Sequence, residues 1–287
     1  MFDLPDGRRM CFDDIGDPAA VVVVYVHGTP DSRRARHPDD DVTRRAGIRL
    51  IAVDRPGAGG SSPHPEGTVG TFADDVAALA AHLDIHALAT LGWSAGALHA
   101  VAVAARHPAL VTSVGIVAGL PPVEAYAEPG ILHHAGDHRR AVADLAGEMS
   151  PAEVGALLAP LVAPYPCDLE LAREYVLEGA DPTRRAEIES VPGALDAMAF
   201  GVVDAVVQGL DGLAHDIALQ IAPPDIELTD VVCPVRLWYG GQDTSAPPSF
   251  GHWFAAHVPD ATLHVLPDAG HCLVLPRWAE IVRAIAA

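Results

Sequence analysis

Short apolar segments rich in β-branched residues alternate with amphipathic stretches along the first half of the chain, and this alternation constrains the fold most. The strand-like segments are Val21–Val26, Leu50–Val53, Leu88–Trp93 and Val114–Val117. Apolar residues recur at helical spacing in two stretches between them, Phe72–Leu83 and Ala97–Arg106. Buried strands that alternate with helices predict an α/β fold, with a mostly parallel sheet flanked by helices.

The pattern changes in the middle of the chain, where residues 120–226 predict helices and turns alone. Asp168, for example, can cap the start of a helix. Strand and helix patterns return afterwards, at Val235–Tyr239, Phe250–His257, Leu263–Val265 and Trp278–Ala286. We therefore predict one catalytic core, formed by residues 1–119 and 227–287, with residues 120–226 inserted as a helical cap.

The composition excludes several classes of function. The 287 residues include no Lys and no Asn, and 18 Arg face 38 Asp and Glu, for a formal net charge of −20. Without lysine the chain can have no P-loop lysine, no Schiff base and no Ser–Lys dyad, and without asparagine it can have no Cys-His-Asn site. So negative a field repels nucleic-acid phosphates and anionic lipids, so we expect a small-molecule substrate and neither nucleic acid nor membrane as a partner.

The chain shows no signal-peptide pattern, and its longest apolar run, Ala19–Val26, is much too short to span a membrane. Its four cysteines lie far apart and form no C-x-x-C pair. We therefore expect a cytoplasmic protein with reduced cysteines. The oligomeric state does not follow from the sequence.

The strongest chemical motif is Gly92-Trp93-Ser94-Ala95-Gly96, which lies where a strand turns into a helix. Small residues two positions before and after a serine allow the strand and the helix to pass close together, and the sharp turn exposes the hydroxyl group. We therefore predict Ser94 as a nucleophile at a nucleophile elbow. Trp93 either lines the substrate pocket or fills the core.

A serine nucleophile needs a base, and the base needs a carboxylate that orients it. Asp243 follows the strand Val235–Tyr239, and His271 follows the next strand, so both lie where open sheets place their sites. The order serine, acid, histidine is that of a nucleophile-elbow hydrolase. We predict Ser94, His271 and Asp243 as the catalytic triad, with Glu124, just beyond another strand, as the alternative acid.

An oxyanion hole completes this chemistry and requires two backbone N–H groups. Ala95, directly after the nucleophile, is the first predicted donor. The second comes from the loop His27-Gly28-Thr29-Pro30, in which Pro30 has no N–H, so we predict Thr29. We expect His27 to support this loop and not to act as a second base.

Five motifs together resemble the α/β-hydrolase superfamily over nearly the whole chain: His27–Pro30, Asp54–Ser61, Gly92–Gly96, Gly240–Asp243 and Ala269–His271. The resemblance implies an eight-stranded sheet, a Ser-His-Asp triad, no cofactor and a variable cap that shapes the substrate pocket. The segment from Gln208 to Asp216, followed by Val235–Asp243, is similar to a bacterial branch whose activities are generally unassigned. Epoxide-hydrolysing and dehalogenating members carry an aspartate at the elbow, so Ser94 argues against both activities.

These observations predict a serine hydrolase that cleaves a small to medium carboxylic ester, thioester or lactone through an acyl-enzyme. Residues 120–226 hold 18 acidic residues and five Arg, which favours neutral substrates. Two alternatives stay open: a cofactor-free C–C hydrolase or lyase, and a non-catalytic small-molecule receptor or pathway accessory protein. We expect no metal site, because the cluster His133, His134, Asp137 and His138 is more typical of a solvated helix face.

Overall fold

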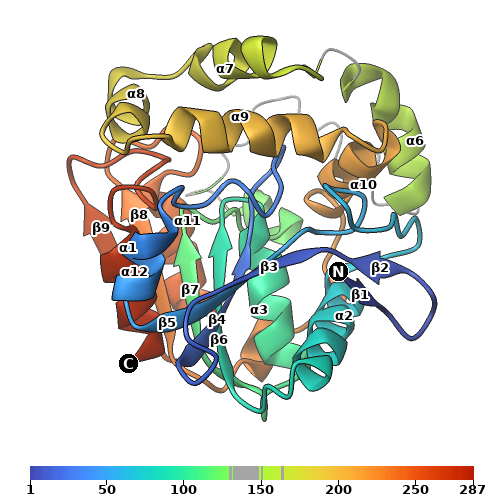
Figure 1. The fold of residues 1–287 in the computed structure, drawn as a ribbon, viewed down its shortest axis with the longest axis vertical. Helices are drawn as coiled ribbons and strands as arrows, with labels where there is room; N and C mark the ends of the chain where they lie inside the picture. The colour runs from blue at the N-terminus through green and yellow to red at the C-terminus, as the bar shows by residue number, and fades with distance from the viewer. Residues whose placement is uncertain (129–130, 132–148, 150, 163–164) are drawn as a thin grey trace.

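The computed structural model describes residues 1–128, 131, 149, 151–162 and 165–287. Figure 1 shows a twisted sheet with helices on both of its faces and a further layer of helices above one of its edges. The mostly parallel sheet flanked by helices that the alternation predicts is confirmed.

The strands of the main sheet run in the order β3-β5-β4-β6-β7-β8-β9. The first of them, β3, pairs antiparallel with β5, and all other pairs are parallel. Their bounds are β3 (Phe12–Ile15), β4 (Val21–Val26), β5 (Ile48–Val53), β6 (Leu88–Trp93), β7 (Val111–Val117), β8 (Val235–Gly240) and β9 (Ala261–Leu266). Because most strands are parallel, their carboxyl ends meet at one edge, where the motif-bearing loops follow.

The main sheet has seven strands within the described residues, where the resemblance implies eight. Two further strands, β1 (Phe2–Asp3) and β2 (Arg9–Met10), lie outside the main sheet and form a separate antiparallel ribbon. Cys11 lies between β2 and β3: its N–H donates to the Ser61 hydroxyl (2.8 Å), and its carbonyl accepts from Asp54 N (2.9 Å), just after β5. Among the described strands, β1 pairs with β2 alone.

Helices cover both faces of the sheet and bury its central strands (Figure 1). One face carries α2 (Val69–His82), α3 (Gly96–Arg106) and α11 (Pro248–His257), and the other carries α1 (Asp40–Arg45) and α12 (Trp278–Ala286). Thr90 donates a hydrogen bond toward α3, to Ala100 O (3.1 Å), whereas Ser113 on β7 donates toward α12, to Ile285 O. Burial on both faces explains why these strands are apolar throughout most of their length.

The layer above the carboxyl edge of the sheet consists of helices that lie between β7 and β8 in the sequence (Figure 1). We call α6–α10 the inserted helices: α6 (Pro151–Val162), α7 (Leu169–Leu177), α8 (Pro182–Glu189), α9 (Ala194–Ala205) and α10 (Asp211–Leu219). Short 3-10 helices flank them, η1 (Val123–Ala127) and η2 (Leu228–Asp230). The predicted cap of α7 is confirmed, because the Asp168 side chain accepts from the N–H groups of Glu170 and Leu171.

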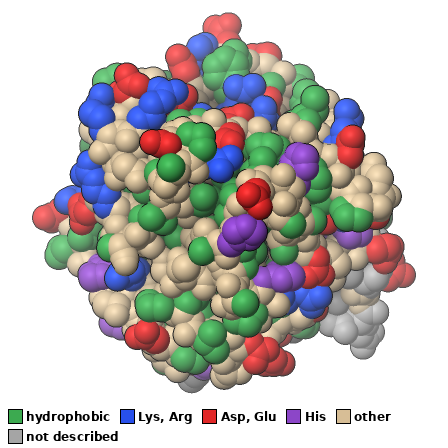
Figure 2. Space-filling view, turned by 60° about the horizontal axis from the view of Figure 1, so that its bottom comes forward, with side chains coloured by type: hydrophobic (Ala, Val, Ile, Leu, Met, Phe, Trp, Pro, Cys, Tyr) green, Lys and Arg blue, Asp and Glu red, His purple; other side chains and the backbone are tan. Residues whose placement is uncertain are grey.

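Acidic and basic side chains alternate closely on part of the surface. Figure 2 shows blue arginine and red acidic side chains interleaved at the upper left of the face that it draws. Ion pairs of this kind join Arg36 to Asp40, Arg44 to Asp41 and Arg49 to Asp14, each at 2.7 Å. No helix in the described part of the chain combines the length and the apolarity that crossing a membrane requires.

Candidate active site

Ser94 lies at the tight turn between β6 and α3, in the left-handed region with φ of 53°. Glycines on either side make this turn possible. A Cβ atom at Gly92 would lie 2.5 Å from Gly96 O, and one at Gly96 would lie 2.4 Å from Val26 O. The elbow expected from the sequence is therefore present, and its close packing holds Ser94 in a conformation that non-glycine residues rarely adopt.

The structure brings together the three residues predicted as a triad. His271 Nε2 lies 3.2 Å from Ser94 Oγ, and His271 Nδ1 lies 2.8 Å from Asp243 Oδ2. The carboxylate can only accept, so Nδ1 carries the proton and Nε2 is free to accept from the serine hydroxyl. The Asp243 side chain is fully buried, whereas that of His271 keeps 14% of its surface exposed. This geometry is the one that general-base activation of a serine requires.

Asp243 is held rigidly by its own loop. Its second oxygen, Oδ1, accepts from the N–H groups of Ser245 (2.8 Å) and Ala246 (2.9 Å). Glu124, the alternative acid, is exposed in η1, and no hydrogen bond or ion pair joins it to His271 in the described part of the structure. Of the two candidate acids, only Asp243 touches the histidine.

A buried carboxylate that the sequence did not predict holds the His271 loop from above. Glu187 on α8 accepts from Gly270 N with Oε1 (2.6 Å) and from Cys272 N with Oε2 (2.9 Å). Its two oxygens therefore hold the backbone on both sides of His271. Burial raises the pKa of the Glu187 carboxyl group, and the two backbone N–H groups counteract this shift.

Trp93 contacts the same histidine from the core side. Its Nε1–H donates to the backbone carbonyl of His271 (3.0 Å), and the two rings lie with centroids 6.0 Å apart. Trp93 also lines the pocket in front of Ser94 while it is 2% exposed. It therefore belongs to both the core and the pocket wall, which were alternatives at the level of sequence.

The Gly28–Thr29 peptide has the orientation that an oxyanion hole needs. Arg55 Nη2 donates to Gly28 O (2.6 Å), which fixes the carbonyl toward the guanidinium. In a trans peptide the N–H points opposite to the carbonyl, so the Thr29 N–H points away from Arg55. Neither Thr29 N nor Ala95 N donates to an acceptor among the described residues, and both residues line the pocket beside Ser94.

An ion pair connects this loop to the inserted helices. Arg55 Nη1 pairs with Asp216 Oδ1 on α10, and the Thr29 hydroxyl donates to the other oxygen of Asp216. Arg55 is 1% exposed, so the pair is largely shielded from solvent. His27 supports the loop from below: its Nδ1–H donates to Gly28 O (2.8 Å), and its Nε2 accepts from Arg55 N (3.1 Å).

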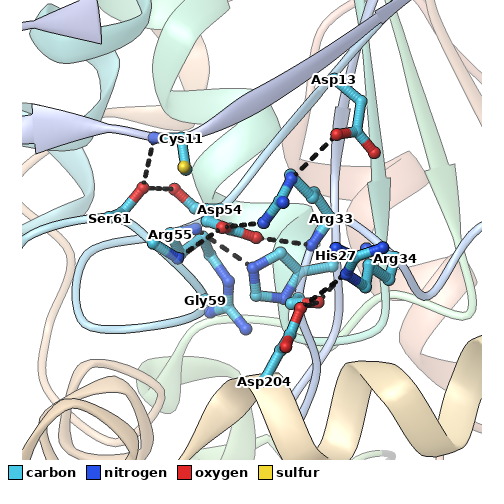
Figure 3. A network of polar contacts seen from close by, with 12 residues as sticks. Cys11, Asp13, His27, Arg33, Arg34, Asp54, Arg55, Gly59, Ser61 and Asp204 are labelled. Carbon is cyan, nitrogen blue, oxygen red and sulfur yellow. Dashed lines mark hydrogen bonds and ion pairs between the residues drawn. The ribbon is translucent and has the colours of Figure 1, made fainter. Parts of the chain in front are cut away.

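His27 is unsuited to act as a base. Both of its ring nitrogens are engaged, and burial, together with the nearby Arg55 charge, lowers its pKa well below the usual value. Figure 3 shows His27 beside Arg55, and next to them the buried carboxylate of Asp54. Asp54 accepts from Arg33 N (2.8 Å) and Gly60 N (3.0 Å), so the Asp54–Ser61 motif organises this loop and does not line the pocket.

The pocket in front of Ser94 has a volume of about 350 Å³, which suits a small to medium ligand. Core loops and inserted helices both contribute to its wall. The lining includes Thr29, Ser94 and His271 from the core and Tyr175, Arg184 and Met198 from the inserted helices.

No group of three His, Cys, Asp or Glu side chains within the described ranges is arranged to hold a metal ion. The cluster His133, His134, Asp137 and His138 lies outside the described residues. Cys272 is fully buried, and burial raises the pKa of its thiol to about 12, so it packs beside His271 as a neutral group.

Comparison with known proteins identifies the family. A family model described as alpha/beta hydrolase fold matches residues 21–146. The chain is 30% identical to the pimeloyl-[acyl-carrier protein] methyl ester esterase of Chromobacterium violaceum, over 96% of this chain and 95% of the relative.

Solved structures show the same fold. An esterase from Exiguobacterium antarcticum matches 99% of this chain and 97% of its own, with a TM-score of 0.68 and 19% identity. An enol-lactonase from Burkholderia xenovorans matches 98% of this chain and 97% of its own, with a TM-score of 0.67 and 20% identity. On the similarity to the Chromobacterium relative along almost its entire length, the chain belongs to the α/β-hydrolase fold family.

Proposed function

We propose that this enzyme, an α/β-fold carboxylic ester hydrolase, cleaves its substrate with Ser94 as nucleophile, His271 as base and Asp243 as the acid that orients the base. The observation that carries the proposal is the His271 ring, which lies between Ser94 Oγ (3.2 Å) and Asp243 Oδ2 (2.8 Å) at the pocket wall. The relatives named as esterases support the same reaction class.

In the first half of the reaction, His271 Nε2 takes the hydroxyl proton while Ser94 Oγ attacks the ester carbonyl carbon. The carbonyl oxygen becomes an oxyanion, which the N–H groups of Thr29 and Ala95 stabilise. The protonated imidazole then gives its proton to the departing alkoxide, and the alcohol leaves an acyl group on Ser94. Asp243 stabilises the imidazolium that exists between these two steps.

In the second half, water takes the place of the alcohol. His271 removes a proton from the water, the hydroxide attacks the acyl carbon, and a second oxyanion occupies the same hole. Return of the proton from His271 to Ser94 Oγ releases the carboxylic acid. The sequence of steps consumes one water and needs no cofactor.

The pocket volume favours acyl groups of small to medium size, and thioesters and lactones share the same carbonyl chemistry. We further propose that residues 120–226 act as a cap, since the inserted helices supply part of the pocket wall. The pimeloyl-[acyl-carrier protein] methyl ester esterase relative supports a carboxylic ester as the first class to test.

Turnover of a panel of short-chain p-nitrophenyl and methyl esters tests the proposal. We expect Ser94→Ala to lower kcat on the order of 10³-fold or more, because no other group supplies the nucleophile. Ser249→Ala is a matched control, since the Ser249 hydroxyl has no hydrogen-bond partner among the described residues and lies outside the pocket. Absence of turnover on the whole panel, or equal activity in Ser94→Ala, would overturn the proposal. Ester binding without turnover would favour a receptor, and cleavage of a diketone alone would favour a C–C hydrolase.

A further inference from the structure

One guanidinium on the pocket wall has no carboxylate partner in the described part of the chain. Arg184, on α8, lines the pocket that contains Ser94 and His271. Within the described ranges, no carboxylate oxygen lies within 4.0 Å of its side chain, and its buried Nε has no hydrogen-bond partner. The adjacent Arg185 differs, because it is exposed and pairs with Glu189 (3.7 Å).

None of the acidic groups near Arg184 forms a direct ion pair with it within the described ranges. Glu187 uses both oxygens on the backbone N–H groups of Gly270 and Cys272. Burial raises the pKa of Asp31 well above its usual value, which favours its uncharged form. A side-chain hydrogen bond joins Arg184 to the Cys272 thiol, which burial keeps neutral. An unpaired cation in a partly buried pocket favours an anionic ligand group.

The position of α8 places this cation beside the reacting centre. Arg184 and Glu187 are three residues apart and therefore lie on the same side of the helix. Glu187 holds the backbone on both sides of His271, and a Cβ atom at Gly270 would lie 3.4 Å from Arg184 N. The local charge of the pocket wall thus differs from the net charge of the acid-rich segment 120–226.

We propose that Arg184 binds a carboxylate on the substrate, so that the preferred esters are half-esters of dicarboxylic acids. A planar guanidinium can donate two parallel hydrogen bonds to a carboxylate, whereas a neutral ester offers only weaker acceptors. This inference rests on the proposed ester hydrolysis and defines its substrate class. It replaces the preference for neutral substrates that the net charge alone predicts.

Isosteric substrates test the inference. The monomethyl esters of succinic, glutaric and adipic acid are compared with the methyl esters of the corresponding ω-amides, which have the same size and no charge. We expect at least one half-ester to exceed its amide by about tenfold or more in kcat/KM. We expect Arg184→Gln to remove this advantage, mainly through KM, so that the kcat/KM of the half-ester falls far more than that of the amide ester. Arg185→Gln is the control at the adjacent position and should leave kcat/KM unchanged for both substrates.

A binding measurement separates this inference from the proposed function. Calorimetry with Ser94→Ala protein measures the affinity for the half-ester and for its amide without turnover. We expect tighter binding of the half-ester, lost in the Ser94→Ala, Arg184→Gln double variant. Equal affinity for both ligands, or an advantage that survives Arg184→Gln, would overturn the inference whether or not the protein hydrolyses esters. Failure of turnover together with selective binding would overturn the proposed function alone.

Discussion

The core and the inserted helices approach the pocket from opposite sides and contribute different kinds of residue. The core supplies Ser94, Asp243 and His271, each in a loop that follows the carboxyl end of a strand. The inserted helices supply Glu187, which holds the backbone beside His271, and Asp216, which contacts Thr29 and Arg55 in the loops after β4 and β5. We infer from this difference that the core carries out the reaction, whereas the insertion positions the core loops and selects the substrate.

The largest expected effect concerns the core. Asp243→Asn removes the acceptor that fixes the His271 tautomer, so we expect kcat to fall by about 10³- to 10⁴-fold while the fold persists. Steady-state kinetics on a methyl ester measures the loss. Glu124→Gln is the control, because Glu124 is exposed and does not touch His271. If the Glu124 variant lost activity and the Asp243 variant kept it, the assignment of the acid would be wrong.

The core site follows from the sequence for a physical reason. Strand ends converge at one edge of a parallel sheet, so Asp243 and His271 could be placed near Ser94 without knowledge of any contact. Glycines at close approaches, such as Gly92 and Gly96, provide further local signals. The fold was predictable for the same reason, except that the N-terminal strand pairs outside the main sheet.

The contributions of the insertion could not be predicted in this way. Helical periodicity predicts a helix such as α8 but not which neighbour it packs against, so it gives no sign that Glu187 reaches residue 271. Asp216 lies 161 residues from Arg55 in the sequence, and no spacing links them. An invariant acidic residue in an otherwise variable segment would be the signal to seek among homologues.

An intermediate effect is expected where the insertion meets the His271 loop. Glu187→Gln replaces one acceptor oxygen by an NH₂ group that faces a backbone donor, so we expect kcat to fall about tenfold through misplacement of His271. Loss of the negative charge disfavours the protonated imidazole, so the acidic limb of the kcat/KM profile should move to lower pH.

Glu189→Gln, on the same helix but exposed, is the matched control for Glu187. A purely structural role for Glu187 predicts lower stability with an unchanged pH profile. That result would show that Glu187 does not position His271 for the reaction. The inserted helices would then contribute less to catalysis than we infer.

The smallest expected effect lies at the boundary of the two regions. Asp31 is buried, and a Cβ atom at Gly201 on α9 would lie 2.6 Å from its Oδ1. Within the described ranges this oxygen has no hydrogen-bond partner. In the unfolded chain the pKa of an Asp side chain is about 4, whereas burial raises the pKa of Asp31 in the folded protein. The folded state therefore binds more protons between these two values, and the stability of the wild-type protein falls as pH rises through that window.

Asp31→Asn lacks this dependence. We expect the variant to exceed the wild-type protein in free energy of unfolding by about 1–3 kcal/mol at pH 8, and to match it near about pH 4. Urea unfolding across this pH range measures the difference. A difference in free energy of unfolding that is constant with pH, or a variant less stable than the wild-type protein at pH 8, would show that Asp31 is charged and stabilised in the folded protein.

Trapping of the covalent intermediate tests whether Ser94 is the nucleophile. Rapid acid quench during turnover of p-nitrophenyl acetate, followed by peptide mass spectrometry, locates any acetyl group on the chain. We expect an acetyl group on Ser94 that forms and decays at rates consistent with kcat and is absent in Ser94→Ala. Sustained turnover with no adduct, or with an adduct that lies on another residue and is kinetically competent, would contradict it.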